Sequence, residues 1–183
     1  HIVSSPELDN NKIISSKKEV LIENVIEAIE NDHKVLIFVN YLSSIESICN
    51  SLKENKIKFL KMTGQTKDRQ SLVDKFQSDN RYKVFVMTLK TGGVGLNLVS
   101  ADTIFIYDPW WNKTVENQAI DRAYRLGQDK TVFAYKMIMR NTIEEKILKL
   151  QEIKDKLLDD LISEDNLSSK NLSKNDIEFI LGN

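Results

Sequence analysis

The stretch VFVMTLKTGGVGLNLVSADTIFIYDPWWN, residues 84–112, contains two short apolar runs on either side of a glycine-rich segment. The runs at 84–88 and 103–108 consist mainly of β-branched and aromatic residues, and they lack the polar alternation of a strand exposed on one face. Such runs are typical of parallel strands that are buried on both faces of a sheet. The stretch therefore predicts two buried strands with a tight turn or a ligand loop between them.

Further apolar runs and several amphipathic segments extend this pattern along the chain. Strands are also predicted at 35–39, 58–64 and 132–138. Helices are predicted to begin near Lys17, Ser43, Thr66 and Thr114, the last ending at Leu126 before Gly127. Because strands alternate with helices, we predict an α/β fold with a doubly wound, mostly parallel sheet covered by helices on both faces.

The composition of the chain divides it into four segments. We interpret them as a polar lead-in at 1–16, an α/β domain at 17–141, one long helix at 142–163, and a Ser- and Asn-rich linker with a short helix at 164–183. The long helix begins with a capping box between Thr142 and Glu145. It either packs as a flank on the sheet or forms a brace that reaches a partner or another lobe.

The charge and the rare residue types of the 183-residue chain exclude several classes of protein. Its formal net charge of −1 provides no overall basic field, so a contact with nucleic acid has to be a local patch. One cysteine and two histidines exclude an internal disulfide and a metal site built from Cys or His clusters. No apolar run approaches the ~18 residues of a membrane span, so we expect an intracellular protein without a membrane partner. The Lys-, Asn- and Ile-rich composition slightly favours a bacterial cytoplasm or nucleoid over a eukaryotic nucleus.

Ligands of open α/β sheets bind beyond the carboxyl ends of the strands, and we expect three stretches of the chain at such ends. The first is GQTKDRQ, residues 64–70. Gly64 permits a turn, and a helix starting near Thr66 would present free backbone N–H groups to a phosphate. A turn without any ligand is the alternative.

The second stretch is TLKTGGVGLN, residues 88–97, in which Gly92, Gly93 and Gly95 let the backbone approach a ligand or simply turn tightly. The chain contains no Walker A sequence, G-x-x-x-x-G-K-[ST], and its glycine spacing differs from the dinucleotide-binding G-x-G-x-x-G. The sequence therefore predicts a close approach to a ligand without a phosphate cradle of its own.

The third stretch is QAIDRAYRLGQ, residues 118–128, which holds two of the few arginines of a lysine-rich chain. On a helix, Gln118, Arg122 and Arg125 share one face. The planar guanidinium grips phosphate oxygens with two donors, which lysine cannot do. The stretch therefore indicates a triphosphate site, although a surface pair answering Asp121 or Glu116 would use the same residues.

These motifs occur in an order that identifies a family. KVLIFVNY (34–41), GQTKDRQSLVDKF (64–76), the stretch at 84–112 and QAIDRAYRLGQ together resemble the second RecA-like lobe of the Swi/Snf ("Snf-two") family of superfamily-two ATPases. The resemblance runs from about Lys34 to Leu150, where the long helix is similar to the brace of the family. It implies a motor that couples ATP hydrolysis to translocation along double-stranded DNA.

The resemblance implies an incomplete ATP site. The first, N-terminal lobe of such motors carries the Walker motifs and binds most of the ATP and Mg²⁺, and the second lobe supplies arginine fingers. Arg122 and Arg125 match those arginines, with Arg125 as the finger on the γ-phosphate, and Gln118 begins the motif and orders the site. Gly93, Gly95 and Asn97 match the segment that faces both the nucleotide and the DNA, and we expect them to bind the nucleotide.

The resemblance also implies contacts with the DNA backbone and bases. The matching positions are Gly64, Gln65, Thr66, Arg69, Thr88, Lys90 and Trp111. An exposed Trp111 can stack on or wedge against bases, whereas a core Trp111 would only support the sheet; Trp110 is the better candidate for burial. Asn40 departs from the Ser or Thr that is common in the family, which leaves its role open.

The expected partners are double-stranded DNA, the N-terminal RecA-like lobe of the same protein, and an unidentified DNA-bound protein that the motor moves. Without that lobe, this chain alone should not hydrolyse ATP, whether it is part of a longer protein or a separate gene product. Two alternatives stay open: a catalytically silent regulatory or binding module, and the second lobe of an RNA helicase.

Overall fold

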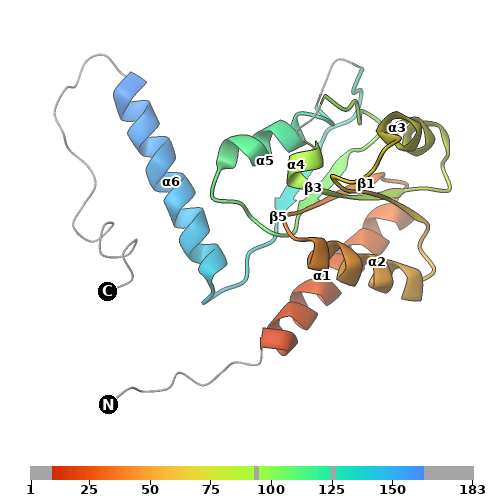
Figure 1. The fold of residues 1–183 in the computed structure, drawn as a ribbon, viewed down its shortest axis with the longest axis horizontal. Helices are drawn as coiled ribbons and strands as arrows, with labels where there is room; N and C mark the ends of the chain where they lie inside the picture. The colour runs from red at the N-terminus through yellow and green to blue at the C-terminus, as the bar shows by residue number, and fades with distance from the viewer. Residues whose placement is uncertain (1–9, 93–94, 125–126, 163–183) are drawn as a thin grey trace.

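The computed structural model describes residues 10–92, 95–124 and 127–162. The strands within these ranges are β1 (Val35–Val39), β2 (Phe59–Met62), β3 (Val84–Thr88), β4 (Thr103–Ile106) and β5 (Phe133–Lys136). The helices are α1 (Asn10–Glu30), α2 (Leu42–Glu54), α3 (Arg69–Ser78), α4 (Leu89–Gly92), α5 (Lys113–Ile120) and α6 (Ile143–Ile162). The strands form one parallel sheet in the order β2-β3-β1-β4-β5 (Figure 1). The predicted α/β fold is confirmed.

The two faces of the sheet are covered by different helices (Figure 1). Val35, Ile37 and Val39 of β1 belong to a core that includes α1 and α2. Leu36 and Phe38 of the same strand belong to a second core that includes α3, α4 and α5. Because alternate residues of β1 supply both cores, the strand has to be apolar throughout, as its sequence indicates.

Two helices begin earlier than the sequence analysis predicted. α1 begins at Asn10 and not at Lys17, because no glycine or proline interrupts the chain between Asn10 and Glu30. α2 begins at Leu42 with Tyr41 in the N-cap position, where no side chain caps the helix. The predicted cap at Ser43 is therefore wrong, since the Tyr41 carbonyl already accepts the first helical hydrogen bond, from the Ile45 N–H at 3.3 Å.

The helix that carries the arginine motif ends sooner than predicted. α5 ends at Ile120, and the chain then tightens into turns in which the Arg122 N–H donates to the Ala119 carbonyl and the Ala123 N–H to the Ile120 carbonyl. These shorter steps replace helical bonds and redirect the chain toward β5. The prediction of one continuous helix from Thr114 to Leu126 is wrong for this reason.

The long C-terminal helix bridges the two helical layers beyond β5. Near its start, Glu144 pairs with Lys17 of α1 at 2.5 Å, and further along Asp155 pairs with Lys113 of α5. Its cap is a variant of the predicted capping box: the Thr142 hydroxyl accepts from the Glu144 N–H at 3.2 Å, while the Glu145 carboxylate accepts from the Asn141 N–H at 2.8 Å. Across the described ranges, no helix is long and apolar enough to cross a bilayer.

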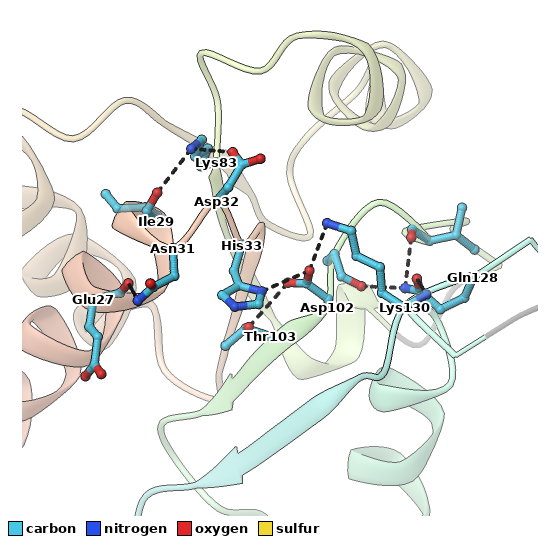
Figure 2. A network of polar contacts seen from close by, with 12 residues as sticks. Glu27, Ile29, Asn31, Asp32, His33, Lys83, Asp102, Thr103, Gln128 and Lys130 are labelled. Atoms are coloured by element: carbon cyan, nitrogen blue, oxygen red, sulfur yellow. Dashed lines mark hydrogen bonds and ion pairs between the residues drawn. The ribbon is translucent and has the colours of Figure 1, made fainter.

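Asp102 is a buried carboxylate at the amino ends of the strands (Figure 2). It accepts a hydrogen bond from Lys130 Nζ at 3.1 Å and lies 3.1 Å from His33 Nδ1. Burial raises the pKa of this carboxyl, but the contacts with His33 and Lys130 outweigh burial and leave the pKa below the ordinary 3.8. The ionised Asp102 thus joins the segments that lead into β1, β4 and β5.

We predict that Asp102→Asn lowers the free energy of unfolding near neutral pH by about 1–3 kcal/mol, because the amide cannot carry the charge that Lys130 needs. The pKa of Asp102 is lower in the folded chain, so its ionisation favours folding above the unfolded pKa, and this contribution is lost as the pH falls through the folded value, below 3.8. Urea unfolding at a series of pH values should show the two chains converging only in that acid range. Asp129→Asn, at an exposed neighbour, is the control, and equal stability of the Asp102→Asn chain near neutral pH would contradict the prediction.

Candidate functional site

The turn after β2 contains four of the predicted residues, and one of them, Arg69, holds the backbone of the turn. The Arg69 guanidinium donates to the Gly64 carbonyl at 3.1 Å and to the Thr66 carbonyl at 3.3 Å, and Gly64 and Gln65 are exposed. α3 begins at Arg69 and not at Thr66, because Asp68 is the N-cap and accepts the Ser71 N–H at 3.1 Å. Asp is the stronger cap, so the predicted start of this helix near Thr66 is wrong, and the N–H groups of its first turn follow Asp68 instead.

The segment after β3 begins with an ordered turn. The Thr88 and Thr91 hydroxyls lie 2.6 Å apart, and Lys90 is exposed on the short helix α4. Beyond it, Gly95 has a φ of +55°, a backbone conformation that glycine adopts without strain. Asn97 is exposed, and its carbonyl accepts from the Gln77 side chain at 2.8 Å. Gly93 lies outside the described residues.

A hydrogen bond connects the residue that follows the glycine-rich segment to the arginine motif. The Leu98 N–H donates to the Arg122 carbonyl at 3.0 Å. Arg122 Nε in turn donates to the Gln118 carbonyl at 3.2 Å, so these two residues stay close although Arg122 is no longer in the helix. Arg125, the predicted finger, lies outside the described residues. The structure therefore places the end of the segment at Asn97 and Leu98 next to Arg122, which contacts Gln118.

The predicted residues fall on two separate parts of the lobe. One part is the carboxyl edge of the sheet, where ligands of parallel sheets bind. It holds the turn after β2, Thr88 as the last residue of β3, Lys90 just beyond it, and Trp111 in the loop after β4. α5 runs back from that edge, so Arg122 lies beside the segment that leads into the start of β4. The prediction that all three stretches lie at carboxyl ends is wrong for the third stretch, because its functional part follows the helix and not the strand.

The tryptophan pair belongs to a loop that polar contacts fix to the end of β1. The Asn40 side chain donates to the Asp108 carbonyl at 2.7 Å and to the Pro109 carbonyl at 3.3 Å. The backbone N–H of Asn40 donates to the Asp108 carboxylate at 3.1 Å. This structural role answers the question that the sequence left open for Asn40. Trp110 is half-buried against the core, whereas Trp111 is 53% exposed. The alternative in which Trp111 is a core residue that supports the sheet is therefore wrong.

Gln128 fixes the arginine segment from the other side (Figure 2). Its amide nitrogen donates to the carbonyls of Val99 at 2.9 Å, Ala101 at 2.8 Å and Ala123 at 3.3 Å, and its oxygen accepts the Lys130 N–H at 2.9 Å. Gln128 is the last residue of the motif, and its sequence context did not predict this role. Only its place in the motif could have pointed to this role, because two of the carbonyls that it binds, those of Val99 and Ala101, belong to a distant segment.

The sequence of the chain matches a known protein family and several of its members. The family described as the helicase conserved C-terminal domain matches residues 16–127. An uncharacterized ATP-dependent helicase of Mycoplasma pneumoniae is 40% identical over 153 residues, which cover 82% of this chain and 15% of that protein. The chromatin-remodeling ATPase INO80 of Candida glabrata is 36% identical over 147 residues, covering 79% of this chain and 10% of that protein. The chain thus spans a small part of the length of these curated relatives.

A solved structure shows the same architecture. The crystal structure of the C-terminal part of the Fun30 ATPase domain superposes with a TM-score of 0.70 at 32% sequence identity. The superposition covers 79% of this chain and 52% of the other.

We predict that Trp111→Ala lowers the free energy of unfolding of this chain by no more than about 1 kcal/mol, because half of the side chain is already in contact with water. Trp110→Ala is the matched control, and it should cost about 2–3 kcal/mol because this ring packs against the core. Chemical denaturation of the two variants measures the difference. A larger loss for Trp111→Ala than for Trp110→Ala would contradict the exposure of Trp111.

Proposed function

Because this chain belongs to the helicase C-terminal domain family, in its Swi/Snf branch, we propose that it is the second motor lobe of an ATP-dependent double-stranded DNA translocase. ATP and Mg²⁺ are bound mainly by the N-terminal RecA-like lobe of the same protein. The present chain, as the second lobe, completes that site with Arg122, Arg125 and Gln118. It also grips the DNA backbone at the carboxyl edge of its sheet.

The hydrogen bond between Leu98 and Arg122 is the observation that carries the proposal. It connects the residue after Asn97 to Arg122, and Arg122 contacts Gln118, which supports a site to which both motifs contribute. A glycine backbone and an arginine fork together suit the oxygens of a triphosphate that another lobe presents. The chain has no Walker A loop, so such a surface can complete an ATP site but cannot form one.

The carboxyl edge supports the proposed grip on DNA. Gly64 and Gln65 are exposed at the turn after β2, Thr88 ends the neighbouring strand β3, and Lys90 lies just beyond it. Backbone N–H groups, hydroxyls and a lysine are the groups that position a protein on phosphates without reading the sequence. Trp111, exposed at the end of β4, adds a ring that can stack on bases. A local contact of this kind is compatible with a net charge of −1.

We predict that duplex DNA stimulates ATP hydrolysis by the longer, two-lobe protein far more than single-stranded DNA or RNA does, and that this chain alone stays at background. The chain alone lacks the Walker A lysine and the Mg²⁺-binding carboxylate motif that phosphoryl transfer requires. Steady-state turnover with each nucleic acid is the measurement. Stimulation by RNA alone would favour the second lobe of an RNA helicase, absence of hydrolysis in the longer protein would favour a silent module, and turnover by the purified chain would contradict the division of the site.

We predict that Arg125→Ala in the longer protein lowers turnover by about 10³- to 10⁵-fold while ATP binding to the other lobe persists. This loss corresponds to about 4–7 kcal/mol of activation free energy. Arg125→Lys should fail almost as badly, because a point charge cannot make the two-donor contact. Arg140→Ala, at an exposed arginine outside the motif, is the control. An Arg125→Ala protein that keeps more than roughly a tenth of the turnover would show that Arg125 is not a finger.

A further inference from the structure

Both polar groups of the Trp110 backbone are held by buried side chains. The Trp110 N–H donates to Glu116 Oε1 of α5 at 2.6 Å, and the Trp110 carbonyl accepts from the Gln151 amide of α6. Glu116 is 1% exposed and Gln151 is 2% exposed. A loop that could lie free on the surface is thus fastened from two helices at the residue before Trp111.

Lys136 closes these contacts into a ring. Its ammonium group pairs with Glu116 Oε2 at 2.6 Å and donates to Gln151 Oε1 at 2.8 Å. Lys136 is the last residue of β5, so the ring connects the loop to α5, β5 and α6. The second oxygen of Glu116 therefore has a partner in this ammonium group, and the buried charge is compensated.

Such a ring holds its members in one arrangement. A buried carboxylate or amide is costly unless its partners are all in place, and a partly satisfied network is worse than an apolar contact. If α6 leaves its position, the Trp110 carbonyl loses its donor and Lys136 loses one of its acceptors. The seating of α6 and the geometry of the tryptophan loop are therefore coupled.

Trp111 lies next to these polar contacts and also contacts α6. Its ring centroid is 5.4 Å from Lys154 Nζ, on the turn of α6 after Gln151, and 6.1 Å from the ring centroid of Trp110. Lys113, which follows the loop, pairs with Asp155 of α6. The exposed ring is thus oriented by its neighbour's backbone and by α6, and not by burial of its own surface.

We propose that Gln151, together with Glu116 and Lys136, positions Trp111 for contact with DNA. The indole ring of Trp111 then has the orientation that DNA requires only while α6 stays packed against the tryptophan loop. The contact with DNA rests on the proposed function, whereas the positioning of the ring does not require DNA. Gln151 is then a positioning residue on the C-terminal helix, and displacement of that helix disconnects ATP hydrolysis from movement along DNA.

Fluorine NMR of this chain labelled with fluorotryptophan tests the positioning directly. The chain has two tryptophans, so the Trp111 signal is assigned by comparison with Trp111→Phe. Gln151→Leu removes the donor to the Trp110 carbonyl, and we expect the Trp111 signal to shift and broaden as the ring samples several orientations. Glu152→Leu places leucine at the next, exposed position of α6 and should leave the signal unchanged.

A second variant keeps the test decisive if Gln151→Leu does not fold. Gln151→Glu preserves the size of the side chain and can still accept from Lys136, but an ionised carboxylate cannot donate to the Trp110 carbonyl. The Trp111 signal should therefore shift in this variant as well. An unchanged Trp111 signal in a folded Gln151 variant would overturn the proposal.

The DNA arm of the test uses the longer protein and compares triplex displacement with ATP hydrolysis. Trp111→Ala should lower the ratio of displacement to hydrolysis, Gln151→Leu should lower it by about the same factor, and the double variant should lose no more than either alone. A purely structural role of Gln151 would lower both activities together and leave their ratio unchanged, which would overturn the proposal. If the fluorine signal shifts while Trp111→Ala leaves the ratio unchanged, the positioning stands and the proposed contact between Trp111 and DNA fails.

Discussion

The complete burial of β1 is the constraint on which the rest of the lobe depends. Every residue of this strand is inaccessible to water, and the strand pairs in register with β3 on one side and β4 on the other. Its backbone groups can be satisfied only by these neighbours, and its side chains only by helices on both faces. Lys34, just before the strand, donates its buried ammonium group to the Phe76 and Gln77 carbonyls at the end of α3, and burial lowers the pKa of this lysine although Asp79 opposes the shift.

The parallel sheet that follows from this constraint separates the two proposed contacts in space. The turns after β2, β3 and β4 meet at the carboxyl edge, whereas α5 carries the chain back toward the amino ends and delivers Arg122 there. On the proposed function, α5 is the direct connection between the two surfaces. Trp111 precedes the first turn of α5 and Arg122 follows its last turn. A small shift of this helix would therefore change the proposed contacts with DNA and with the nucleotide together.

The edge strand β5 is the least buried part of the sheet, and polar contacts hold it at both ends. Phe133 and Tyr135 are about half exposed. Before the strand, Lys130 pairs with the buried Asp102, and at its last residue Lys136 pairs with the buried Glu116. Hydrophobic burial is small here, so these ion pairs and the pairing with β4 fix the strand. The first pair connects it to the segment before β4, and the second connects it to Glu116, which holds the tryptophan loop.

The fold class and the identity of the motifs could be predicted from the sequence because they depend on local features. β-branched runs such as Val35–Val39 specify strands without knowledge of their neighbours, and paired arginines specify a chemistry wherever they are placed. The start of α3 and the end of α5 were missed, because a competing cap at Asp68 and a change to shorter hydrogen bonds after Ile120 decide them within one turn.

Only the tertiary structure decided that Trp111 is exposed, that Asn40 holds the loop and that Gln151 reaches the Trp110 carbonyl. Each of these depends on contacts between residues far apart in the chain, for which neighbouring residues carry no signal.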